Sequence, residues 1–110
     1  MTNPRPKGKQ GELDVATRLR RLLHDDTIRR NLEQSATGGR DLIGDTIEHL
    51  AIEVKRTEIV RLPQWMDTLQ VQNPHRRPVV IHRASRDPWR CWFRMTLEEF
   101  ATMIETGRFP

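Results

Sequence analysis

Two carboxylates and a lysine have the types and spacing that phosphodiester chemistry requires. Asp41 directly precedes the short apolar run Leu42-Ile43. Glu53 and Lys55 come later in the chain and are separated from each other by Val54. Hydrolysis of a phosphodiester uses divalent cations, which bind hard oxygen ligands such as carboxylates. A lysine two residues from one carboxylate points to the same side of a strand, where it can orient water or stabilise developing charge. These three residues predict a metal-dependent site, with Asp41 and Glu53 as the ligands.

The segments that carry these residues have the pattern of a β-hairpin. Residues 50–55 alternate between aliphatic side chains and Ala51, Glu53 and Lys55, which is typical of a strand with one apolar face. The run Leu42-Ile43 forms a shorter strand before it, and Gly44-Asp45 indicates a turn between the two. Asp45 is an alternative ligand to Asp41. Gly44-Asp45 fits a turn better than the end of a strand, so we prefer Asp41 as the metal ligand.

The remaining pattern predicts an α/β or α+β domain built on one central sheet. Residues 24–37 are ambiguous between helix and strand. We expect residues 1–8 to be a flexible basic arm and residues 9–110 to be a single domain. Within that domain, helices are expected at residues 9–23, from Leu62-Pro63 to Asn73-Pro74, and between Thr96 and Gly107, and strands at 79–82 and 89–95.

The C-terminal strand and helix each have a recognisable signature. Thr96 and Glu99 form a capping box, which opens a helix that Gly107 ends. Its apolar face would consist of Leu97, Phe100, Ala101 and Ile104. In the strand before it, Cys91 falls on the apolar side and is expected in the core. Trp92 falls on the other side, among arginines, where it is either exposed on a basic face or buried in a dimer contact.

Composition limits the class of protein. The chain has 110 residues and a formal net charge of +4, and most of its 19 basic residues are arginines, which suit phosphate oxygens. No apolar run approaches the length of a membrane span, and the N-terminus lacks the apolar stretch of a secretory signal. The single cysteine fits a reducing compartment. We therefore expect an intracellular protein that is encoded by a bacterium or a phage and acts in the cytoplasm of the bacterial cell. We also expect its partner to be a nucleic acid.

The motif residues resemble those of the PD-(D/E)xK nuclease superfamily, in particular archaeal-type Holliday-junction resolvases and small phage-encoded nucleases. Asp41 matches the family aspartate within Gly38-Gly39-Arg40-Asp41, and Glu53-Val54-Lys55 matches the second half. The expected element order also matches, and Glu12 stands where such proteins often carry a glutamate in the first helix. Arg40 replaces the proline that often precedes the aspartate. The family's glutamine in the second helix has three candidates here, Gln64, Gln70 and Gln72.

The resemblance implies a restriction-endonuclease-like core, a mixed sheet with the order αβββαβ, followed by an extra strand and helix. It implies a DNA endonuclease that uses Mg²⁺ or Mn²⁺ and whose substrates include branched DNA. Proteins of this family are often homodimers. Asp41, Glu53, Lys55 and Glu12 would form the catalytic centre, with Asp41, Glu53 and Glu12 as metal ligands. A basic surface beside them would bind DNA through Arg18, Arg21, Arg40 and Arg56. The alternative is an inactive DNA-binding or scaffold module on the same fold.

Other residues have structural interpretations of equal or greater weight. Glu12 is either a metal ligand or an acid of the first helical turn, favoured there by the helix dipole. The four histidines lack the spacing of metal ligands, and His82, at the end of a strand, is interpreted as structural. Trp65 and Trp89 could stack on bases, but their spacing favours the core.

Overall fold

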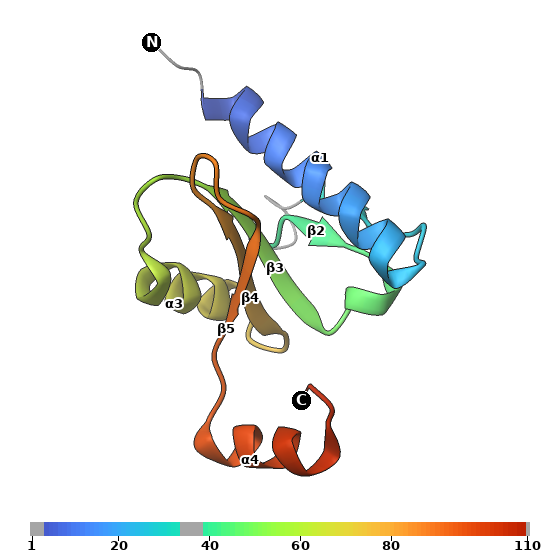
Figure 1. Cartoon of the computed structure of the whole chain (residues 1–110), viewed down its shortest axis with the longest axis vertical. Helices are drawn as coiled ribbons and strands as arrows, with labels where there is room; N and C mark the ends of the chain where they lie inside the picture. Colours follow the sequence, from blue (N-terminus) through green and yellow to red (C-terminus); the bar gives the residue numbers. More distant parts are fainter. Residues whose placement is uncertain (1–3, 34–38, 110) are drawn as a thin grey trace.

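A five-stranded mixed sheet in the order β1-β2-β3-β4-β5 organises the α+β fold (Figure 1). The computed structural model describes residues 4–33 and 39–109. Only β3 and β4 are parallel, and every other neighbouring pair is antiparallel. The 24–37 segment, which the sequence left open between helix and strand, contains a two-residue strand within its described part. The strands are β1 Arg29–Arg30, β2 Leu42–Ile43, β3 Leu50–Arg56, β4 Arg77–Arg83 and β5 Arg90–Phe93.

Within these described ranges, three helices and one 3-10 turn accompany the sheet. They are α1 Pro4–Leu23, the turn η1 Asp45–Ile47, α3 Leu62–Gln72 and α4 Leu97–Thr106. α1 begins at Pro4, not near residue 9 as expected, so residues 4–8 of the predicted arm are helical. Proline is tolerated there because the amides of a first helical turn have no intrahelical partner. Residues 1–3 of that arm, and Gly38 of the motif, lie outside the described residues. No helix in the described ranges combines the length and apolarity needed to cross a bilayer.

The central strand β3 separates two apolar cores. Ile52 packs on the α1 side with Val15 and Ala16, and Ala51 packs on the α3 side with Leu69. The predicted alternation of faces in this strand is confirmed. The charged face of β3 is thus the α3 face, and α3 covers only part of it.

The parallel pair β3 and β4 determines what stands beside the charged residues. Their register places Glu53 opposite Val80 and Lys55 opposite His82. A parallel pair requires a crossover connection, which here is α3, and its residue Trp65 packs beside the α3-side core. The C-terminal half of β3 therefore faces an aromatic side chain from α3.

Asp25 fixes the segment before β1 to the turn η1. Its Oδ1 accepts hydrogen bonds from the backbone N and Oγ1 of Thr27 at 2.9 and 2.6 Å. Its Oδ2 accepts from the backbone N and Oγ1 of Thr46 at 3.0 and 2.6 Å. Beside it, Gly44 has no room for a side chain, since a Cβ there would lie 2.7 Å from Cγ1 of Ile28. The four hydrogen bonds hold the pKa of Asp25 well below its usual range.

The C-terminal part departs from the expected packing. All four β5 residues are exposed, so the prediction that Cys91 belongs to the core is wrong. α4 forms with its predicted capping box, and Gly107 ends it in a left-handed conformation at φ 68°. None of its residues is buried, because the helix points away from the sheet (Figure 1). Sequence alternation correctly predicted this strand, but no helix covers the half of the sheet that it extends.

We predict that Asp25→Ala lowers the thermal unfolding temperature at pH 7. The substitution leaves four donors on Thr27 and Thr46 without their acceptor. The pKa of Asp25 is depressed in the folded state, so its stabilising contribution is fully present above the unfolded value of about 4 and is lost progressively as the pH falls from there toward the much lower pKa of the folded state. The difference between variant and parent should therefore shrink on acidification. Thermal denaturation followed by circular dichroism at pH 3, 5 and 7 measures it.

The neighbouring exposed residue provides the matched control. Asp26→Ala removes the same charge one position along the chain and should leave the unfolding temperature unchanged. Equal effects of the two substitutions would show that the hydrogen bonds of Asp25 do not stabilise this junction.

Candidate metal centre

Asp41 lies at the start of β2 and is fixed by hydrogen bonds from both neighbouring strands. Its backbone N donates to the carbonyl of Ile52 at 2.7 Å, and its carbonyl accepts from the backbone N of Asn31 at 2.8 Å. Its side-chain Oδ2 accepts from the backbone N of Val54 at 2.8 Å. The residue is only 9% exposed. The carboxylate is therefore held against β3 at the residue between Glu53 and Lys55.

Glu53 and Lys55 lie on the same face of β3, as predicted. The Nζ of Lys55 is 3.4 Å from Oε1 of Glu53, and both side chains are partly exposed. The same Nζ lies 5.3 Å from the centre of the Trp65 ring, within the range of a cation–π contact. The ammonium group is therefore held between a carboxylate from its own strand and an aromatic ring from α3.

Glu12 approaches the centre from α1. It lies in the third turn of the helix, because α1 begins at Pro4, so the first-turn dipole interpretation of this residue is wrong. Its side chain is 14% exposed, and Oε1 lies 3.3 Å from Nε of Arg30 on β1. Arg30 thus offsets the charge of a carboxylate that would otherwise be half-buried without a partner.

Burial raises the pKa of Asp41 to about 7. The backbone N–H of Val54 opposes this shift, because a hydrogen bond to the carboxylate favours the ionised form. The negative charges of Glu12 and Glu53 raise the pKa further, while Lys55 lowers it. Asp41 is therefore a buried carboxyl whose ionisation Glu12 and Glu53 oppose and Lys55 favours.

The donor set suits a hard cation in type and charge. Carboxylate oxygens are the ligands that Mg²⁺ and Mn²⁺ prefer. Within the described ranges, no three His, Cys, Asp or Glu side chains stand close enough to hold an ion together as they are. Glu12 is turned toward Arg30, and the carboxylate of Asp41 is held at Val54, the residue next to Glu53 in β3.

The four arginines predicted to bind DNA do not form one surface beside the carboxylates. Arg40 is 9% exposed, with Nη2 3.7 Å from Glu48, so it is buried and does not belong to an exposed basic surface. Arg18 is exposed but pairs with Asp14 at 3.2 Å. Arg21 lies on the opposite side of α1 from Glu12, since nine residues span about two and a half turns. Only Arg56, exposed at the end of β3, directly follows the site.

Sequence reasoning missed three residues that surround the centre. Trp65 contacts Lys55, and its ring lies 5.8 Å from that of His82. His82 donates from Nε2 to the carbonyl of Thr57 at 2.8 Å, which agrees with its predicted structural role. Arg30 neutralises Glu12. Only the strand register and the crossover of α3 bring these residues to the site, and neither can be read from residue spacing.

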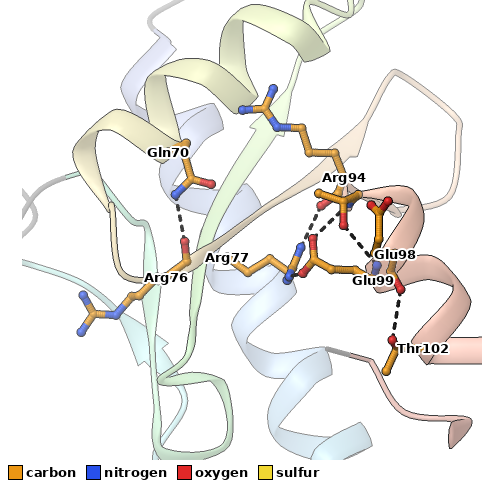
Figure 2. Close-up of polar contacts among 8 residues, drawn as sticks. Gln70, Arg76, Arg77, Arg94, Glu98, Glu99 and Thr102 are labelled. Atoms are coloured by element: carbon orange, nitrogen blue, oxygen red, sulfur yellow. Dashed lines mark hydrogen bonds and ion pairs between the residues drawn. The ribbon is translucent and has the colours of Figure 1, made fainter.

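The glutamines of α3 occupy different environments. Gln70 donates from Nε2 to the carbonyls of Asn73 and Arg76, both at 3.2 Å, near the C-terminal end of α3. Figure 2 shows its bond to Arg76. Gln72 lies beside Gly39. Gln64 is exposed in the first turn of α3. It is the sequence neighbour of Trp65, whose ring contacts Lys55, so it is the α3 glutamine closest in the chain to the site.

Comparison with known proteins gave no match to a family model, a curated protein or a solved structure.

We predict that Asp41→Asn stabilises the metal-free protein at pH 8 but not at pH 4. A carboxyl whose pKa rises from 3.8 to about 7 on folding favours the unfolded state as the pH increases between these values, because the folded state binds more protons. The full cost above pH 7 is about 4 kcal/mol, an upper limit for the gain from asparagine. Asparagine retains an oxygen that can accept from Val54. Urea unfolding with chelator at pH 4, 6 and 8 measures the change.

Asp45→Asn is the control for this prediction. Asp45 is exposed in η1, so its amidation should leave stability unchanged at each pH. The proposed cost of ionising Asp41 would be contradicted by two results together. The free energy of unfolding of the parent would not change between pH 4 and pH 7, and it would equal that of Asp41→Asn.

Proposed function

We propose that this chain is a DNA nuclease that depends on Mg²⁺ or Mn²⁺ and hydrolyses phosphodiester bonds on a restriction-endonuclease-like core. The observation that carries the proposal is that the buried carboxylate of Asp41 accepts a hydrogen bond from Val54, the residue between Glu53 and Lys55, whose own side chains lie 3.4 Å apart on one face of β3. The succession of α1, β1, β2, β3, α3 and β4, followed by β5 and α4, supports it, since it has the order αβββαβ expected of that core.

The energetics of Asp41 support a cation at this position. Burying a carboxylate beside other carboxylates is unfavourable, and a fold retains such an arrangement where a cation can offset it. Oδ2 of Asp41 accepts from Val54, so Oδ1 would be the oxygen offered to the metal. Glu53 would supply a second ligand from β3. A bound cation would polarise the phosphate and lower the pKa of a coordinated water.

Glu12 would complete the ligand set directly or through water. Its carboxylate is already oriented by Arg30 at 3.3 Å, as ligand carboxylates commonly are by surrounding hydrogen bonds. Arg30 would then act as a positioning residue, which keeps Glu12 ionised and limits its rotamers. This role would explain why Arg30 pairs with Glu12.

Lys55 would provide the positive charge that the reaction needs beside the ligands. Its Nζ contacts Glu53 and the ring of Trp65, so the ammonium group is restrained before substrate arrives. From there it can orient the attacking water or offset the charge that develops on the phosphate. Preorganisation of this kind is effective because no reorientation is required during the reaction.

The proposed substrate is DNA, which the enzyme would cut at internal phosphodiester bonds. Branched DNA is among the proposed substrates. Phosphates would approach the exposed edge of the carboxylates at the C-terminal end of β3, where Arg56 follows Lys55. Phosphate contacts release counterions, so DNA affinity should fall with salt.

We expect Asp41→Asn and Glu53→Gln to abolish or strongly weaken both metal binding and cleavage while the fold is retained. Each substitution removes one anionic ligand and leaves the shape of the side chain almost unchanged. Calorimetry with Mg²⁺ and Mn²⁺ measures the first effect. Incubation of labelled linear, nicked and four-way DNA, with metal and with chelator, measures the second.

Asp45→Asn serves again as the matched control and should retain the parent's metal affinity and cleavage. Cleavage by the parent that persists undiminished in Asp41→Asn or Glu53→Gln would place the chemistry on other residues. Metal-independent DNA binding by a parent that cuts none of these substrates would favour the inactive DNA-binding module instead.

Lys55→Ala should separate binding from catalysis. The cationic Lys55 does not ligate the metal, so metal and DNA affinities should stay close to those of the parent. The rate at saturating DNA should fall on the order of 10²–10³-fold, comparable with the loss of one preorganised electrostatic donor elsewhere. Lys55→Arg should not restore the rate, because the guanidinium is longer and planar. Single-turnover kinetics tests this, and an unchanged rate in Lys55→Ala would exclude the assigned role.

A further inference from the structure

An apolar groove lies between α1 and the edge strand β5, on the face of the sheet opposite to the charged side chains of β3. Val15, Leu19 and Leu22 of α1 form one wall, and Ile81 and Cys91 form the floor. These two floor residues are register partners in β4 and β5. The groove has a volume of about 400 Å³, which lies within the range of small-molecule sites.

The two ends of the groove differ in polarity. Arg18 reaches back along α1 to Asp14, with 3.2 Å between its Nε and Oδ1 of the aspartate. Arg83 lies at the end of β4, and its guanidinium carbon is 5.9 Å from the centre of the Trp89 ring. Leu22 comes one turn after Arg18 and is 70% exposed. The groove therefore has a basic end beside the β4–β5 turn and an apolar end along α1.

Asp14 holds the basic end in shape. Its Oδ2 accepts a hydrogen bond from Nε1 of Trp89 at 2.7 Å, and its Oδ1 accepts from Nε of Arg18 at 3.2 Å. α1 also approaches the tryptophan ring at Gly11, where a Cβ would lie 3.4 Å from the nearest ring carbon. The turn between β4 and β5 is thus fixed against α1 (Figure 1). The groove is consequently formed before any ligand binds.

The basic end keeps an excess of positive charge after its ion pairs are counted. Asp14 is engaged by Arg18, and Oδ2 of Asp87 lies 3.9 Å from Nη1 of Arg90. Arg83 is the third arginine here, and no third carboxylate lines the groove. Within residues 4–33 and 39–109, the guanidinium of Arg83 contacts the Trp89 ring and donates no hydrogen bond. Its donors are therefore available to an anion that enters the groove.

We propose that this groove binds an amphipathic small molecule, a monocarboxylate with an apolar chain. The planar guanidinium of Arg83 can bind both carboxylate oxygens, and the chain would lie along Leu19 and Leu22 over Ile81. Burial of the chain would supply most of the affinity, and the guanidinium would determine which end of the ligand enters first. A nucleic-acid backbone offers no apolar part to cover this wall. The proposal is independent of the candidate metal centre, which lies on the other face of the sheet.

Calorimetry on the full chain, without DNA or metal, tests this proposal with sodium octanoate as the probe. One octanoate should bind per chain. Hexanoate should bind roughly fifteenfold more weakly, because each buried methylene changes the affinity about fourfold. Octanol and octylamine have the same chain without the carboxylate, so each should bind at least tenfold more weakly than octanoate.

Cys91 reports whether the probe binds in the groove. It is the single cysteine of the chain and lies in the floor of the groove. Burial raises the pKa of its thiol, and alkylation by iodoacetamide requires the thiolate, so the reaction is followed at pH 8.5. Octanoate should slow the alkylation with the same concentration dependence that calorimetry gives. An alkylation rate that saturating octanoate leaves unchanged would place the ligand elsewhere and overturn the proposal.

Two substitutions test the two ends of the groove separately. Leu22→Glu places a charge beside the apolar chain, and Arg83→Gln removes the proposed carboxylate partner. Each should weaken octanoate binding at least tenfold, whereas Arg83→Gln should leave octanol binding unchanged. Circular dichroism confirms that each variant is folded.

Val71→Glu and Arg61→Gln are the matched controls. They make the same kinds of change at exposed residues outside the groove, so both should bind octanoate as the parent does. The proposal is overturned if octanoate shows no saturable binding or binds no better than octanol. It is also overturned if Leu22→Glu and Arg83→Gln bind octanoate as tightly as the parent.

Discussion

The hydrogen bond from the backbone N of Val54 to Oδ2 of Asp41 is the interaction on which the candidate centre depends. β2 contains only two residues, and its register with β3 includes Leu42 opposite Ile52. Beyond that pair, the side chain of Asp41 replaces a backbone carbonyl as the acceptor for β3. The same bond places a carboxylate at the residue between Glu53 and Lys55. One contact thus extends the sheet and assembles the charged residues, so the site cannot be separated from the strand pairing.

The position of Asp41 also has an energetic cost that the rest of the fold must offset. A carboxyl with a pKa near 7 favours the unfolded state at neutral pH. Two well-packed cores on either face of β3, and the four hydrogen bonds of Asp25, oppose this. The contrast between the two aspartates is instructive. Asp25 is surrounded by donors, which favour its charge, whereas Asp41 has one donor to its side chain and two acids, Glu12 and Glu53, that oppose its charge. An arrangement that weakens the fold at one residue is common where that residue has a function.

Apolar residues are distributed unevenly over the sheet. β3 and β4 are covered by helices on both faces, and five of the seven β4 residues are buried. β5 and α4 are exposed, although their apolar content is similar. The arrangement in Figure 1 places α1 and α3 over one part of the sheet and leaves the β5 end uncovered. The proposed chemistry is on β3, which helices cover, whereas the side chains of β5 and α4 stay exposed.

The sequence by itself determined the local structure and the candidate residues. Alternation in residues 50–55, the capping box at Thr96 and the left-handed Gly107 depend on neighbours in the chain, so spacing alone predicts them. It also favoured Asp41 over Asp45 as the candidate ligand. The tertiary structure decided which apolar faces are covered, which is why Cys91 is exposed. It also buried Arg40 and brought Arg30, Trp65 and His82 to the site. These outcomes depend on strand order, register and the crossover of α3, which are set by contacts between residues far apart in the chain and leave no periodic signal within it.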